Sequence, residues 1–209
     1  MSATIPATLV RELREKTGVG FMECKTALAE VGGDMERAIT RLREKGLASA
    51  SKKMGRMASE GLVVSYIHGG GKIGVLLELN CETDFVAKTD EFALLAKDVA
   101  MQVAATNPSY IGRDEVPQAV LENERAIFRA QVAASGKPEA VIDRIVQGRL
   151  EKFFREVCLL EQASIRDPEV TIEDRIKGVI AKVGENVVIR RFCRYHQGEG
   201  VERRPTSSG

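Results

Sequence analysis

The sequence contains few of the residues that build metal sites, disulfide frameworks or export signals. Among 209 residues there are four cysteines, none in a Cys-x-x-Cys pair, and only two histidines. This pattern argues against a zinc site and a disulfide framework, and it favours reduced thiols in a cytoplasmic protein. No apolar run reaches the roughly 18 residues of a membrane-spanning helix. The first residues lack a charged segment followed by an apolar one, so we expect no export signal.

An excess of one charge is also missing. Lys plus Arg number 31 and Asp plus Glu number 30. Proteins that coat nucleic acids usually carry a clear basic excess, so direct nucleic-acid binding is not expected. The local basic group of Lys52, Lys53 and Arg56 is explained as part of a solvated linker. The hydrophobic content of 44% still allows a sizeable core.

The N-terminal segment, residues 1–46, predicts a module of three short helices. Apolar residues recur in it at helical spacing, and glycines separate the three groups. Thr4 is the expected cap of the first helix, and Asp34 is the expected cap of the third, which should end near Gly46. A helical or loose linker is predicted over residues 47–60.

Beyond the linker the apolar period changes from helical to two. Residues 62–67 and 73–79 alternate in this way around the glycine-rich segment 68–72, which predicts a β-hairpin. A last strand is expected over residues 186–195, beside the hairpin.

Helical patterns occupy most of the sequence between the hairpin and the last strand. One helix should open at Thr89 or Asp90, and two long antiparallel helices should flank the short loop at residues 135–138. Thr171 starts a further helix. The predicted class is α+β, with the three-helix module followed by an antiparallel sheet covered by helices on one face. The core domain is expected at residues 61–196 and a disordered tail at 197–209.

Familiar nucleotide-binding and catalytic motifs do not fit this sequence. Gly69, Gly71 and Gly74 match a dinucleotide fingerprint formally, but a strand follows them where the pyrophosphate requires a helix N-terminus. Cys81 could act as a nucleophile only with His68 as its base. The alternative, a buried structural cysteine, is the usual state of a free thiol. We therefore expect no cofactor, metal or catalytic residue.

The most informative segment is Asn80–Ala87, which follows an apolar strand and precedes a helix. One interpretation places Asp84 and Phe85 on an outward corner, where the ring could insert between elements of a partner and the acid could disturb a nearby cation. In the other, Phe85 packs inward and Asp84 caps the next helix. Composition alone favours the second interpretation, because most Phe residues are buried.

A second informative segment is Thr17–Leu28, in which Phe21 and Met22 open a helix beside Lys25. These apolar side chains could complete a small core, or they could form an adaptable contact surface. Local physics does not separate these two interpretations.

Both segments resemble signatures of bacterial translation elongation factor Ts. Thr17–Leu28 is similar to the Thr-Gly-x-Gly…Cys-Lys-x-Ala-Leu signature, and Glu82–Ala87 is similar to the second signature. Gly184–Asn186 and Arg191-Phe192 extend the likeness over nearly the whole chain.

The resemblance implies a guanine nucleotide exchange factor for elongation factor Tu. It implies that the ubiquitin-associated-like module docks on the partner's GTPase domain and that the corner displaces Mg²⁺, which promotes GDP release. No covalent bond changes in such a protein, so an enzyme is not expected. By this resemblance the module contacts the partner through Arg14, Phe21, Met22 and Lys25. The corner residues are Thr83, Asp84, Phe85 and Val86.

The resemblance is to the short form of the family. Longer members carry a second core half and a coiled-coil insertion, and there is no room for either between Leu159 and Thr171. A single sheet without an internal partner implies a homodimer that brings sheet or helix faces together, with Cys193 near the axis.

Three other functions are also compatible with the sequence. A helical adaptor would bind a different protein through the module. An RNA-binding, ribosome-associated protein would rely on the local basic clusters and show steep salt dependence. A thiol enzyme would require Cys81 to be reactive.

Overall fold

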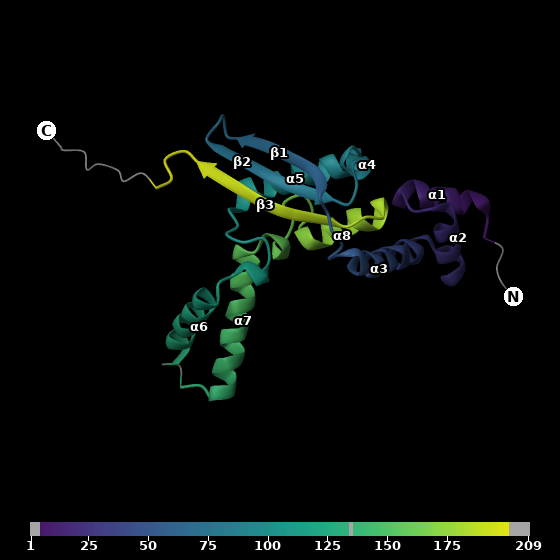
Figure 1. Cartoon of the computed structure of the whole chain (residues 1–209). Helices are drawn as coiled ribbons and strands as arrows, with labels where there is room; N and C mark the ends of the chain where they lie inside the picture. The colour runs from purple at the N-terminus through teal and green to yellow at the C-terminus, as the bar shows by residue number, and fades with distance from the viewer. Residues whose placement is uncertain (1–4, 134–135, 201–209) are drawn as a thin grey trace. The chain divides into compact units, whose positions relative to one another are not determined.

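The computed structural model describes residues 5–133 and 136–200 of the chain. These residues form helices and one three-stranded antiparallel sheet, which confirms the predicted α+β class (Figure 1). The elements are α1 (Ala7–Thr17), α2 (Phe21–Glu30), α3 (Met35–Lys53), β1 (Glu60–His68), β2 (Ile73–Cys81), α4 (Asp84–Ala87), α5 (Asp90–Thr106), η1 (Arg113–Glu115), α6 (Gln118–Ala133), α7 (Glu139–Val157), η2 (Leu159–Glu161), α8 (Ile172–Val183) and β3 (Val187–His196).

The chain divides into two compact units, and each combines segments that are distant in sequence. The described residues of the first unit are 5–61, 80–95 and 173–188. Those of the second are 62–79, 96–172 and 189–200. The expected division into module, linker and core along the sequence stays a prediction.

The three-helix module of the first unit forms as the periodicity predicts. Asp34 caps α3, because its carboxylate accepts the backbone N–H of Arg37 at 2.9 Å. Thr4, the expected cap of α1, lies outside the described residues, and the N-cap position is taken by Pro6. The small apolar core of the module consists of Val10, Leu13, Cys24, Ala27, Leu28, Ala38 and Leu42.

The prediction that α3 ends near Gly46 is wrong, because the helix continues to Lys53. Gly46 serves close packing instead of helix termination. A Cβ atom at this position would lie 3.1 Å from the Cβ atom of Ala181 in α8, which is closer than most real contacts of a Cβ atom. The missing side chain therefore lets the two helices approach each other.

The sheet has the order β1-β2-β3, with the two strands of the predicted hairpin followed by the last strand. Gly69, Gly70 and Gly71 all have positive φ angles in the turn, which closes through a bond from the Lys72 N–H to the His68 carbonyl. The described part of the predicted tail, residues 197–200, forms a turn in which the Gln197 N–H donates to the Lys72 carbonyl at 2.8 Å. The predicted disorder therefore does not describe these residues, and 201–209 lie outside the described part.

The two faces of the sheet differ in exposure. Alternate residues of β2 are fully buried, whereas those between them are exposed or half-buried. Arg191 of β3 pairs with Glu78 of β2 at 2.6 Å, which places Cys193 and Tyr195 on the less buried face. This outer sheet face exposes Val63, Ile67, Leu76, Cys193 and Tyr195.

In the second unit, α6 and α7 form the predicted antiparallel pair (Figure 1). Arg129 of α6 forms ion pairs with Glu139 and Asp143 of α7, which adds polar contacts across the pair. The small apolar core between α6 and α7 consists of Val132, Ile142, Val146 and Leu150.

Among residues 5–133 and 136–200, none of the helices has both the length and the apolar character that a membrane span requires.

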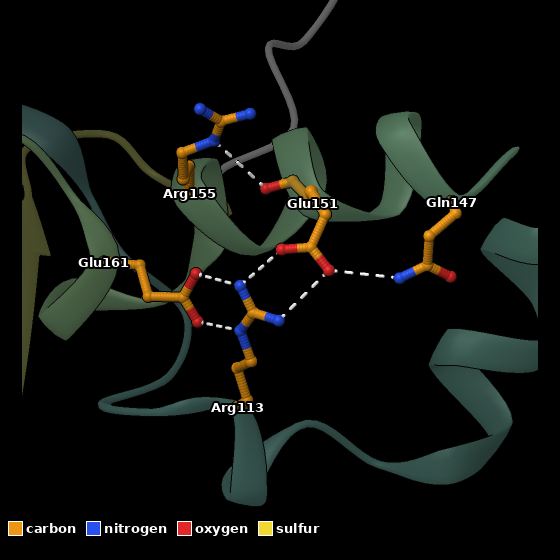
Figure 2. A network of polar contacts seen from close by, with 5 residues as sticks. All are labelled: Arg113, Gln147, Glu151, Arg155 and Glu161. Atoms are coloured by element: carbon orange, nitrogen blue, oxygen red, sulfur yellow. Dashed lines mark hydrogen bonds and ion pairs between the residues drawn. The ribbon is translucent and has the colours of Figure 1, made fainter. Parts of the chain in front are cut away.

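A polar cluster around Arg113 joins η1, α7 and η2 (Figure 2). The guanidinium donates to both carboxylate oxygens of Glu161, and to those of Glu151 at 2.6 and 3.2 Å. It also lies 4.4 Å from the centre of the Phe154 ring. The two carboxylates raise the pKa of Arg113, and Arg113 lowers the pKa of Glu151. We call Arg113, Glu151 and Glu161 the arginine cluster.

Candidate partner-binding corner

The corner between β2 and the short helix α4 presents a large apolar side chain to solvent. Phe85 is 79% exposed, whereas the next two residues, Val86 and Ala87, are buried. The interpretation in which Phe85 packs inward is therefore wrong. Asp84 does not cap a helix either, because Thr83 occupies the N-cap position of α4. The role of this corner in partner binding stays a prediction.

Asp84 forms an exposed ion pair with Lys88, four residues along the chain. The Lys88 amino group lies 2.6 Å from a carboxylate oxygen of Asp84, and this contact raises the pKa of Lys88. Exposed pairs of this spacing contribute little to stability, because solvent screens them. Another cation could therefore replace Lys88 at little cost in free energy.

Thr83 is held by a carboxylate that sequence reasoning did not single out for any role. Glu185 accepts the Thr83 backbone N–H at 2.9 Å and the Thr83 hydroxyl at 2.7 Å. The hydroxyl donates to Glu185 and accepts no backbone N–H of α4, so the side chain of Thr83 makes no capping bond. The available signal was the similarity of Gly184–Asn186 to the family, which marked the position without explaining it.

Cys81 lies in the same corner as a buried structural thiol. Its Sγ donates to the Thr83 carbonyl at 3.1 Å. Burial raises the pKa of the thiol, and the negative charge of Glu185 raises it further. The raised pKa favours the protonated thiol. His68, its proposed base, bonds through Nδ1 to the Tyr66 hydroxyl at 2.9 Å. These observations do not favour the thiol-enzyme alternative.

The predicted contact residues of the helical module lie on its surface. Phe21 is 37% exposed and Met22 is 66% exposed, although Cys24 in the same helix is buried in the module core. Arg14 and Lys25 are also exposed, and neither has an ion-pair partner among the described residues. Phe21 and Met22 are thus at the surface, while other residues supply the core.

The structure does not link these module residues directly to the corner. Within residues 5–133 and 136–200, no hydrogen bond, ion pair or ring contact joins Arg14, Phe21, Met22 or Lys25 to residues 83–86. In the same ranges, no group of three or more His, Cys, Asp or Glu side chains could hold a metal ion. The arrangement offers two separate exposed contact groups.

A family model described as "Elongation factor TS" matches residues 14–179 of the chain. The match spans most of the sequence and includes both signature segments. This chain belongs to the elongation factor Ts family. The family assignment supports a nucleotide exchange role and does not favour the adaptor alternative.

Individual relatives agree with this assignment over nearly their whole length. Elongation factor Ts of Thermoanaerobacter sp. (strain X514) is 63% identical over 198 residues, which cover 95% of this chain and 97% of the relative. The Caldanaerobacter subterraneus protein of the same name is 62% identical over 199 residues, with 95% and 100% covered. That of Desulforamulus reducens is 59% identical over 202 residues, with 97% and 93% covered.

Proposed function

We propose that this chain is a guanine nucleotide exchange factor that binds elongation factor Tu with GDP, displaces Mg²⁺ and promotes GDP release during translation elongation. The observation that carries the mechanism is the exposed Phe85 side chain on an anchored corner of an elongation factor Ts family member. The chain changes no covalent bond and acts in the cytoplasm, without direct nucleic-acid binding.

The corner acts on the metal rather than on GDP itself. A GTPase holds its nucleotide through a magnesium ion that bridges the phosphates and through a fixed phosphate-binding loop. Insertion of Phe85 between the elements around that ion separates them, and the Asp84 carboxylate disturbs nearby cations. Weaker magnesium binding then weakens GDP binding. By linkage, GDP weakens the binding of the exchange factor by the same factor.

Phe85 does not supply the whole effect. A loss of nucleotide affinity of about ten-thousand-fold requires roughly 5.5 kcal/mol of differential binding free energy. Burial of one Phe side chain contributes about 1.5–3 kcal/mol. The remainder comes from the rest of the interface, which keeps the corner inserted.

The helical module supplies a large part of that interface. Phe21 and Met22 offer exposed apolar area at the start of α2, and a flexible Met side chain adapts well to a partner surface. The exposed cations Arg14 and Lys25 are available for carboxylates of the GTPase domain. The module, residues 1–46, thereby binds the partner while the corner acts on the magnesium site.

The direct test measures GDP release from purified elongation factor Tu. Catalytic amounts of the full chain should accelerate the dissociation of labelled GDP, and excess Mg²⁺ should reduce the acceleration. No acceleration at any concentration would contradict the proposal. A pull-down that returns a different protein and no GTPase would instead support the adaptor alternative.

The chain also forms a homodimer through the outer sheet face. Val63, Ile67, Leu76 and Tyr195 are each at least half exposed, and large apolar side chains exposed on one face are typical of protein interfaces. The free thiol of Cys193 is exposed on the same face. Light scattering should give the dimer mass at micromolar concentration, and Ile67→Lys should shift it toward the monomer. A monomeric wild-type chain would contradict the proposal.

A further inference from the structure

A carboxylate from a distant segment fixes the start of the helix that carries Phe85. Glu185 follows α8 closely and uses both carboxylate oxygens on Thr83, at 2.9 Å from the backbone nitrogen and 2.7 Å from the hydroxyl oxygen. Hydrogen bonds to an ionised acceptor are among the stronger ones in proteins. Because Thr83 is the N-cap residue of α4, these bonds determine where and in which direction α4 begins.

The contact between the two segments is reciprocal. The Glu82 carboxylate accepts the backbone N–H of Asn186 at 2.6 Å, so each acid binds the residue that follows the other acid. The Asn186 side chain donates to the Arg56 carbonyl at 2.7 Å, and the Arg56 guanidinium lies 3.7 Å from Glu82. Three separate segments of the first unit thus meet at Thr83 and its neighbours.

The helix α4 depends on such anchors because it is very short. It has four residues, and one helical turn is not stable on its own hydrogen bonds. The Thr83 carbonyl accepts the Ala87 N–H and the Cys81 thiol, which ties the turn to the end of β2. Glu185 fixes the same residue from the opposite segment. The direction of the exposed Phe85 side chain follows from these contacts.

We propose that Glu185 is a positioning residue for nucleotide exchange, which acts through Thr83 to hold Phe85 in its projecting orientation before the partner binds. This inference rests on the proposed exchange function. A corner that is ordered in advance loses less conformational entropy when it inserts into the partner. Without Glu185, α4 would still be exposed, but Phe85 would reach the magnesium site in only a fraction of encounters.

The test compares two variants that keep the length of the side chain. Glu185→Met removes both acceptor oxygens, whereas Glu185→Gln keeps one acceptor and adds a donor that can bond the hydroxyl. GDP release from elongation factor Tu is measured against the concentration of the full chain. Glu185→Met should lower the maximal rate about tenfold or more and change the half-saturating concentration less than about threefold. Glu185→Gln should recover most of the maximal rate.

A matched control removes a carboxylate of the same unit that has no contact with the corner. Glu91 is exposed and pairs with Lys182 at 2.8 Å. Glu91→Ala should leave both the maximal rate and the half-saturating concentration at wild-type values. A loss of rate equal to that of Glu185→Met would overturn the positioning role, because it would assign the effect to charge alone.

Amide hydrogen exchange gives a readout that does not depend on the partner. Exchange at Thr83 and in α4 should be about tenfold faster in Glu185→Met, with wild-type protection in the module core. If Glu185 only stabilised the fold, Glu185→Met would instead accelerate amide exchange throughout the unit. If the methionine variant does not fold, Glu185→Asp, whose shorter side chain reaches only one donor, should show the same local effect to a smaller degree.

The outcomes separate the two proposals. If the wild-type chain accelerates GDP release from elongation factor Tu and Glu185→Met does so to the same maximal rate, the positioning role is wrong and the exchange function stands. If the wild-type chain does not accelerate GDP release, the exchange function is wrong. The positioning role, as defined for exchange, then fails with it, even if local amide exchange shows that Glu185 orders α4.

Discussion

The Thr83–Val86 corner and the arginine cluster are both polar networks at the protein surface, but they leave different groups to solvent. In the arginine cluster, the guanidinium of Arg113 is bonded to two carboxylates and covers a ring, so the polar groups satisfy one another. At the corner, the polar contacts of Thr83 serve to hold an apolar ring that is 79% exposed. The first arrangement satisfies its own polar groups, and the second presents an apolar side chain to solvent.

The comparison predicts that the corner and the cluster separate function from stability. A change at the corner should alter GDP release with little effect on unfolding, because an exposed side chain contributes little to the folded state. A change in the arginine cluster should do the opposite. Substitutions in the two regions test this separation.

Phe85→Ala should give the largest effect. It removes the apolar group that we propose to insert into the partner, and loss of about 1.5–3 kcal/mol of burial corresponds to roughly a 10- to 150-fold slower GDP release. Formation of the complex should stay largely intact. Stopped-flow release of labelled GDP measures the rate, and urea unfolding should change by less than about 0.5 kcal/mol.

Leu94→Ala is a matched control for this substitution. Leu94 is 54% exposed on α5 in the same unit and has no proposed contact with the partner. Its replacement should leave GDP release unchanged. An unchanged GDP release rate in Phe85→Ala would contradict the expected role of the corner in nucleotide exchange.

Met22→Glu should weaken binding rather than slow the maximal release. Met22 is 66% exposed, so a charge is tolerated in the free chain, but it loses solvation when the module docks. The dissociation constant for elongation factor Tu should rise about tenfold, or roughly 1.4 kcal/mol. Calorimetric titration measures it, and wild-type affinity would show that the module surface lies outside the interface.

The sequence predicted the elements of the corner better than the way it is held. Period-two alternation identified β2, and the apolar spacing after Asp90 identified α5, because each pattern is local. Composition alone favoured a buried Phe85, since most Phe residues are buried, and only the family resemblance implied an exposed ring. The Glu185–Thr83 contact joins residues 102 positions apart, and no local pattern encodes a pairing of this kind.

A similar limit explains the wrong end of α3 and the unpredicted arginine cluster. Glycine is a residue type that often ends helices. Position 46 instead needs glycine because Ala181 lies close to it, and this contact exists only in the folded chain. Arg113, Glu151 and Glu161 are ordinary surface residues by type. Their association depends on the arrangement of η1, α7 and η2 in the second unit.

Arg113→Met should destabilise the fold and leave exchange intact. The substitution leaves two carboxylates without their shared cation, and loss of such a network costs about 1–2 kcal/mol for half-exposed groups. Urea unfolding measures the change, and GDP release should stay at the wild-type rate. Arg125→Met is the control, because Arg125 is exposed on α6 without an ion pair among the described residues. Slower GDP release in Arg113→Met would contradict the expectation that the arginine cluster affects stability and not nucleotide exchange.

The smallest effect is the pH dependence of that destabilisation. Arg113 lowers the pKa of Glu151 below its ordinary value of 4.5 in the folded chain. A group with a depressed folded pKa contributes stability above its unfolded pKa and loses it as the pH falls through the folded value. The difference in unfolding free energy between the wild type and Arg113→Met should therefore be largest near about pH 7 and smaller at about pH 3.5. Urea midpoints at both pH values measure it. A difference that is constant with pH would show that Arg113 stabilises through packing on Phe154 rather than through its charge.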